Sequence, residues 1–194
     1  MLGRYRAEVA RVTEPVARAL VGLRLQPNQL SCLGLVSSMA AAAAFAADHR
    51  RTGAACLALA GVLDILDGAV ARVSGRVSPF GAFLDSVLDR YSDLLILAGL
   101  VFLFARLARP DAVVATLLAL IGTVMVSYTR ARAESVGVEC RVGLMERGER
   151  ILILLAGAIF DVLLPAIWVV AIGANATAVY RIVHTRRASG AVLR

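Results

Sequence analysis

Apolar runs of membrane-spanning length constrain this chain more than any other feature. Six such segments occur, at about 29–47, 53–73, 82–105, 112–133, 149–164 and 165–184, and a run of about 20 apolar residues is the length that crosses a bilayer as a helix. Hydrophobic residues make up 59% of the chain and the mean hydropathy is +0.77, whereas soluble domains are about half apolar. We therefore expect an all-α integral membrane protein with six transmembrane helices.

Residues 4–25 differ from the six segments because arginines alternate with apolar residues at helical spacing, with Pro15 as a possible bend. We expect an interfacial amphipathic helix here. Asn28, in the turn that follows, is a candidate N-cap. The chain is too short for two membrane domains, so 1–194 is one domain, with 1–27 as the juxtamembrane helix, 28–187 as the six-helix bundle and 188–194 as a tail. Between the last two segments, Asp161 and Pro165 predict either a tight turn or a kink in one long span.

The positions of the basic residues predict the orientation. All 21 basic residues are arginine. With six spans, seventeen of them lie on the side of both termini and four on the other side, so the positive-inside rule places both termini in the cytoplasm. The localisation expected is a multi-pass protein of the cell membrane. A net charge of +7 is explained by topology and by contact with anionic membrane lipids. Nucleic acid is not an expected partner, since no soluble module is large enough to bind it.

Acidic residues are concentrated where two of the apolar segments meet. Asp64 and Asp67 are three residues apart, and Asp85 and Asp89 are four apart, so on helices each pair shares a face. The connection between the pairs, "VSGRVSPFG", is typical of a turn. An antiparallel helix pair would therefore gather four carboxylates at the cytoplasmic membrane surface.

Four carboxylates this close to a bilayer require a cationic partner, because charge is costly there and like charges repel. Arg72, Arg76 and Arg90 lie nearby in the sequence. A cluster of oxygen ligands is also the environment that hard divalent ions such as Mg²⁺ bind. The alternative is that these acids are solvated charges at the ends of a loop, but intramembrane acids in paired helical spacing favour a functional site.

The same stretch matches the signature D-x2-D-G-x2-A-R-x8-G-x3-D-x3-D at every fixed position. It resembles the CDP-alcohol phosphotransferase family, whose architecture is an amphipathic helix followed by six spans. The resemblance implies that two divalent ions, Mg²⁺ or Mn²⁺, are held by the four aspartates, with Asp89 also acting as the general base. It further implies contacts with the CDP-lipid. The residues that match those roles are Asp64, Asp67, Asp85 and Asp89 for metal, and Gly68, Ala71, Arg72 and Gly81 for the CDP-lipid.

The connection between the fourth and fifth segments bears on the second substrate. "SYTRARAE" and "ERGER" resemble sequences of the phosphatidylinositol phosphate synthase branch of the family, in which basic residues bind inositol phosphate. Those positions fall on Arg130, Arg150 and Arg181. Arg130 stands where that branch has lysine, and Gly148 stands where it has proline. Three converging guanidiniums suit a phosphate dianion.

The resemblance therefore implies transfer of a phosphatidyl or archaetidyl group from CDP-diacylglycerol or CDP-archaeol to inositol 1-phosphate, with release of CMP, by a homodimer. Glycerol 3-phosphate is the first alternative acceptor, and an uncharged alcohol such as serine would leave the arginines unexplained. A cation transporter is the alternative from another class, but the later segments lack the deep acidic residues that an ion path needs.

Overall fold

The computed structural model of the chain describes residues 6–192, which form seven α-helices and no strand. The first five residues and the last two of the predicted tail lie outside the described part. The chain falls into two compact units that meet within one helix, between Gly99 and Leu100, and each is described by itself. The helices are α1 (Arg6–Gly22), α2 (Pro27–Ala46), α3 (Arg50–Val73), α4 (Pro79–Arg106), α5 (Pro110–Ser135), α6 (Arg147–Ile159) and α7 (Leu163–Val192).

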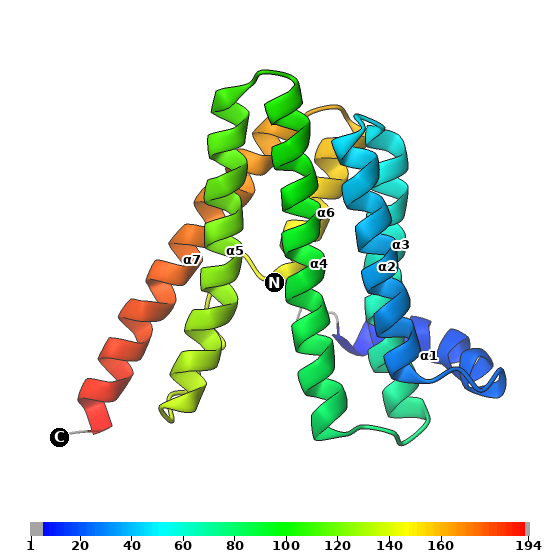
Figure 1. Cartoon of the computed structure of the whole chain (residues 1–194). Helices are drawn as coiled ribbons and strands as arrows, with labels where there is room; N and C mark the ends of the chain where they lie inside the picture. Colours follow the sequence, from blue (N-terminus) through cyan, green and yellow to red (C-terminus); the bar gives the residue numbers. More distant parts are fainter. Residues whose placement is uncertain (1–5, 193–194) are drawn as a thin grey trace. The chain divides into compact units, whose positions relative to one another are not determined.

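The first unit is built on the helical hairpin of α2 and α3, which pack along each other while α1 crosses the lower end of α3 (Figure 1). Ala17 of α1, Leu30 of α2 and Ala69 and Val70 of α3 form its buried cluster. Small residues allow close approach of the helices: a side chain at Gly99 of α4 would collide with the backbone of α2 at Ala42. Such contacts are the usual way in which helices associate in a bilayer, where lipid is as apolar as leucine.

The second unit is organised around α7, which packs against α5 and α6 (Figure 1). A Cβ at Gly122 of α5 would lie 2.6 Å from the Asn175 side-chain nitrogen of α7. That nitrogen donates hydrogen bonds to the Leu118 carbonyl across the helix pair, at 2.9 Å, and to Ala171 within α7, at 2.8 Å. An absent side chain and an interhelical hydrogen bond thus hold α5 and α7 together.

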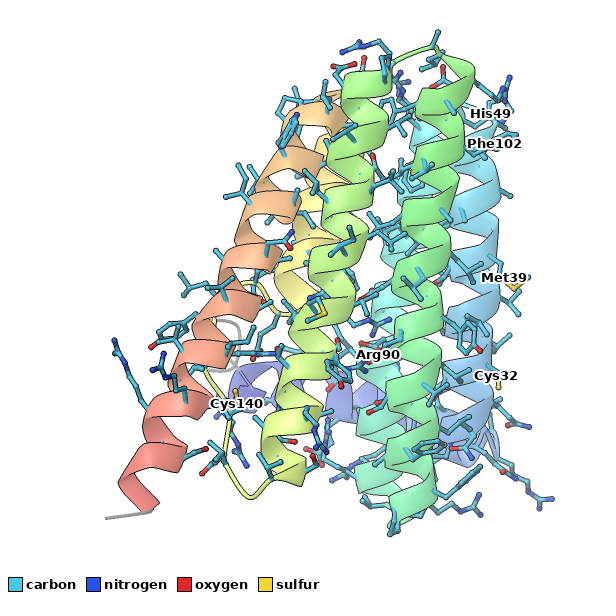
Figure 2. All side chains as sticks on the ribbon, turned by 60° about the vertical axis from the view of Figure 1, so that its left-hand side comes forward. Cys32, Met39, His49, Arg90, Phe102 and Cys140 are labelled. Carbon is cyan, nitrogen blue, oxygen red and sulfur yellow. The ribbon has the colours of Figure 1, made fainter. Side chains whose placement is uncertain are left out.

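Four helices are long and apolar enough to cross a membrane: α2, α3, α5 and α7. Large apolar side chains remain exposed along them, and Met39 (53% exposed) lies on the same edge of α2 as Cys32, about two turns further along the helix (Figure 2). This composition is that of an integral membrane protein, as expected. The predicted total of six spans is reached only if α4 and α6 also cross. The first half of α4 carries three charged residues, Asp85, Asp89 and Arg90, and α6 has 13 residues, about 20 Å of helix against about 30 Å of hydrocarbon.

The last two predicted segments are separate helices rather than one kinked span. α6 ends at Ile159 and α7 begins at Leu163. Asp161 lies in the turn with a φ of 58°, and Pro165 lies inside the first turn of α7, where its missing N–H leaves no intrahelical bond unmade. At the start of α2 the expected N-cap was wrong by two residues, because Gln26 and Gln29 form a capping box there.

Six successive helices, α1 to α6, end in the same way. The chain turns through a residue of positive φ, and the next N–H bonds to a carbonyl five residues earlier, as in the Schellman motif. Glycine occupies two of these six positions, Gly75 after α3 and Gly137 after α5, and the remaining four are Arg24, Asp48, Ala108 and Asp161. An L-residue in this conformation costs about 1–2 kcal/mol.

Ala108→Gly is therefore expected to stabilise the fold by roughly 0.5–1 kcal/mol, since glycine adopts φ = 50° without strain but loses more freedom on folding. Thermal unfolding in detergent, followed through the single tryptophan, Trp168, measures the change. Ala105→Gly, one turn earlier inside α4, is the matched control and should destabilise by up to about 1 kcal/mol. Equal shifts in the two variants would contradict strain at Ala108.

Candidate active site

Three of the four predicted aspartates meet in the first unit. Asp64 and Asp67 lie on one face of α3 and Asp85 lies on α4, and one carboxylate oxygen from each falls within 4.8 Å of the other two. Asp67 is buried, at 6% exposed, and the other two are half-buried. Carboxylate oxygens held at this spacing form a donor set suited to a hard divalent cation. The site as described therefore fits the metal that the sequence predicted.

Ser31 of α2 completes the surroundings of Asp67, and sequence analysis did not identify it. Its hydroxyl donates to the Asp67 carboxylate at 2.6 Å, with the Pro27 carbonyl a more distant acceptor at 3.3 Å. Groups that hydrogen-bond to a metal ligand orient it and are often as important as the ligand itself. The 36 residues between Ser31 and Asp67 explain why no local pattern revealed the contact.

Asp89 lies one turn beyond Asp85 on α4 and is not in the three-carboxylate group. Its carboxylate is 3.6 Å from the Arg90 guanidinium and its side chain is 18% exposed. Arg90, near the middle of α4 (Figure 2), also donates to the Ser86 carbonyl at 2.7 Å. The structure thus separates three aspartates that share a site from a fourth at its edge, so Asp89 remains a predicted ligand and base.

The residues predicted to contact the CDP-lipid line the same two helices. A Cβ at Gly68 would lie 3.3 Å from a guanidinium nitrogen of Arg72, so this arginine folds back over the glycine beside the acids, and Ala71 is half-buried on the same face. The Gly81 N–H donates to the Ser78 hydroxyl at 3.0 Å. Ser78 therefore caps α4, whose first residue is Pro79, and this cap places Asp85 opposite α3.

The three arginines predicted for the acceptor all lie in the second unit, and their environments differ. Arg150 of α6 and Arg181 of α7 are buried, at 4% and 2% exposed. Arg130 of α5 is half-buried, with its side chain 41% exposed, and pairs with Glu134, one turn further along, at 3.0 Å. Two of the three cations are therefore held inside the protein, where burying a guanidinium requires strong compensating contacts.

Those contacts come from α5 and from the connection between α5 and α6. Arg181 donates to the carbonyls of Val126, at 2.5 Å, and Val142, at 2.8 Å, and lies 3.8 Å from the Glu146 carboxylate. Arg150 donates to the Met145 carbonyl at 3.2 Å. Each side chain thus has structural partners as well as the role predicted for it.

Thr177 fastens the same connection to α7, one turn before Arg181. Its hydroxyl accepts the Met145 N–H at 3.2 Å, and its methyl group packs against Gly143, where any side chain would collide with it. Cys140 and Val138 of the connection are buried, and Figure 2 shows Cys140 in this segment. Sequence analysis did not identify Thr177, because a lone threonine in an apolar span has no distinguishing pattern.

Known proteins resemble the chain over most of its length. The family model for CDP-alcohol phosphatidyltransferase matches residues 24–183. The archaetidylinositol phosphate synthase of Methanothermobacter thermautotrophicus is 43% identical over 159 residues, covering 82% of this chain and 77% of that protein.

Solved structures of the Mycobacterium tuberculosis phosphatidylinositol phosphate synthase are similar in fold as well as in sequence. The form with CDP-DAG bound is 34% identical, with a TM-score of 0.83, over 90% of this chain and 94% of that one. The complex with manganese and citrate is 34% identical, with a TM-score of 0.82, over 89% and 88%. The matched range includes the aspartates, the glycines and the arginines described above, and the chain belongs to the CDP-alcohol phosphatidyltransferase family.

Proposed function

We propose that the protein transfers a phosphatidyl or archaetidyl group from a CDP-lipid to inositol 1-phosphate, giving the lipid inositol phosphate and CMP. The observation that carries this proposal is the group of three carboxylates within 4.8 Å inside a complete family signature. The acceptor follows from the relatives, which are named for inositol phosphate products, and from the two buried arginines of the second unit.

The chain's own residues divide the work of the reaction. Asp64, Asp67 and Asp85 hold the divalent cation, with Ser31 orienting Asp67. A divalent cation at these carboxylates would supply charge that polarises the diphosphate and neutralises the departing CMP. Gly68 and Gly81 leave room for the nucleotide, and Ala71 and Arg72 contact it.

Asp89 accepts the proton of the attacking inositol hydroxyl. The new bond joins that oxygen to the lipid-bearing phosphorus, the bond from this phosphorus to the bridging oxygen breaks, and CMP leaves with that oxygen. Asp89 suits this role because it lies one turn from Asp85, at the edge of the carboxylate group. We propose two ions, Mg²⁺ or Mn²⁺, for which Asp89 would supply a further oxygen ligand.

Arg130, Arg150 and Arg181 bind the phosphate of the acceptor. A guanidinium has five N–H donors, and Arg181 uses two of them on backbone carbonyls, so donors remain for a ligand. Glycerol 3-phosphate carries the same phosphate and is the alternative acceptor.

The membrane arrangement proposed is one domain of six spans, α2 to α7, with α1 at the interface and both termini and the site on the cytoplasmic side of the cell membrane. Three observations support this arrangement. The helix α1 runs across the lower end of α3 and not along it (Figure 1), and the sequence of α6 is apolar. With six spans, seventeen arginines lie on one side of the membrane. Small residues on the spans support a homodimer.

The acceptor is tested by CMP release from purified protein supplied with CDP-diacylglycerol or CDP-archaeol and Mg²⁺, with inositol 1-phosphate, glycerol 3-phosphate, serine or inositol added separately. We expect release with inositol 1-phosphate alone. Arg150→Ala should raise the KM for that acceptor roughly 10-fold or more, because a hydrogen-bonded charge is lost, and leave the KM for the CDP-lipid unchanged. Arg141→Ala, an exposed arginine paired with Glu139, is the control. Release with glycerol 3-phosphate would keep the family chemistry and overturn the acceptor.

Asp89→Asn should lower kcat by about 10²–10⁴-fold, the contribution of a positioned general base, and leave CDP-lipid binding largely intact. CMP release gives the rate, and equilibrium binding of the CDP-lipid gives the affinity. Asp111→Asn removes an exposed carboxylate paired with Arg109 and controls for net charge. An Asp89→Asn enzyme with full turnover would remove Asp89 from the mechanism.

Ser31→Ala should weaken binding of Mn²⁺ about 10-fold, because outer contacts of this kind contribute 10–100-fold in metal affinity. Electron paramagnetic resonance of free Mn²⁺ measures binding without turnover. Ser38→Ala is the control, since Ser38 bonds only within α2, to the Gly34 carbonyl. Unchanged affinity in Ser31→Ala would show that its hydroxyl does not support the metal site.

A further inference from the structure

We propose that a pocket at the end of α1 and α3 binds the phosphate group of an anionic phospholipid, a site separate from the one that holds the substrates. The cavity has a volume of about 590 Å³. Four of its lining residues come from the end of α1 and the turn after it, and three from the end of α3. They are Val21, Arg24, Leu25 and Gln26, and Val73, Ser74 and Arg76; we call this the Arg24–Arg76 pocket.

The charge of the pocket is the first argument. It contains two arginines and no acidic residue. Five other arginines pair with an acid close in sequence: Arg18–Glu14, Arg50–Asp48, Arg109–Asp111, Arg130–Glu134 and Arg141–Glu139. Among residues 11–189, no acidic side chain pairs with Arg24 or Arg76. Two guanidiniums at one pocket without a carboxylate favour an anion with several oxygens, and phosphate matches their fork of donors.

The pocket lies at two helix C-termini, where unpaired carbonyls would repel an anion. In this protein, hydrogen bonds within the chain pair some of those carbonyls. The Leu25 N–H bonds to the Leu20 carbonyl at 3.1 Å, and the Arg76 N–H bonds to the Ala71 carbonyl at 3.0 Å. These bonds close both helices through a residue of positive φ, Arg24 at 60° and Gly75 at 66°. The last carbonyls are therefore partly satisfied by the protein itself.

The pocket lies at the C-terminal end of α3, and none of the three carboxylates is among its lining residues. α1 packs on α3 through Ala17, Ala69 and Val70, with Val21 against the same cluster. The lining residues from α3 begin at Val73, six residues beyond Asp67, which is about 9 Å further along the helix axis. A ligand of this pocket is therefore distinct from the nucleotide that the carboxylate group serves.

The apolar surroundings argue for a lipid over a small soluble phosphate. Val21, Leu25 and Val73 line the pocket, and Leu23 and Val77 beside it are 73% and 71% exposed. A phosphate bound by the arginines would thus have apolar side chains next to it, where the glycerol and acyl chains of a phospholipid can pack. Cationic pockets at a membrane surface recognise anionic head groups in this way.

The test is binding of phosphatidylglycerol, compared with phosphatidylcholine, to the purified protein in detergent by native mass spectrometry. Arg24→Gly and Arg76→Gln should each reduce phosphatidylglycerol binding about 10-fold and leave phosphatidylcholine unchanged. Arg24→Gly is the decisive variant, because it removes the cation and also relieves the positive φ at that residue. Its melting temperature should therefore equal or exceed that of the wild type, so weaker binding would not reflect misfolding.

Two controls separate charge from strain. Arg51→Gln removes an exposed arginine at the other end of α3 and should bind phosphatidylglycerol normally. Ala108→Gly relieves a positive φ without removing charge and should do the same.

Binding of phosphatidylglycerol that is unchanged in both arginine variants would overturn the site. Displacement of the lipid by CMP would also overturn it, because the pocket would then belong to the substrate site. Binding of inorganic phosphate that depends on both arginines, without a preference for phosphatidylglycerol, would overturn the lipid as its ligand. Because the lipid is measured without CDP-lipid or acceptor, these outcomes do not depend on the proposed reaction.

Discussion

Three carboxylates held within 4.8 Å of one another in a protein of apolar helices are the constraint on which the rest of this structure depends. Such charges are costly near a bilayer and repel one another, so the helices must be positioned firmly enough to hold them together. Ser31 donates to the most buried of the three, and the Ser78 cap begins α4 close to Asp85. The first unit is thus organised so that α2, α3 and α4 each contribute to one small group of oxygens.

The second unit also holds charged side chains among apolar helices, but these charges are positive. Its two buried arginines donate hydrogen bonds to backbone carbonyls, Val126 in α5 and Val142 and Met145 in the α5–α6 connection. The same connection is fastened to α7 through Thr177. Carbonyls neutralise a guanidinium only in part, which leaves it able to bind an anion. A phosphorylated acceptor is the ligand that this arrangement favours.

Packing in both units depends on residues with little or no side chain. Gly99 meets α2 and Gly122 meets α7 so closely that an added methyl group would collide. These contacts place helix backbones near one another without large apolar interlocking, which has little driving force in lipid. The helix ends differ, because four of the residues with positive φ are not glycine. Glycine at these positions would relieve backbone strain and stabilise the fold. At Arg24 the proposed anion site gives a reason for an arginine in place of glycine.

The sequence by itself determined the helical character, the main apolar segments and the pairing of acids on helix faces, because hydrophobic length and a spacing of three or four residues are local properties of a helix. It placed Asp64, Asp67 and Asp85 together correctly, since both pairs flank a short turn. Only the tertiary structure decided that Ser31 supports Asp67, that Asp89 lies outside the three-carboxylate group, and that Thr177 and Arg181 hold the α5–α6 connection. Each of these depends on contacts between residues distant in the chain or on the rotation of one helix against another. Helical periodicity in the sequence predicts neither.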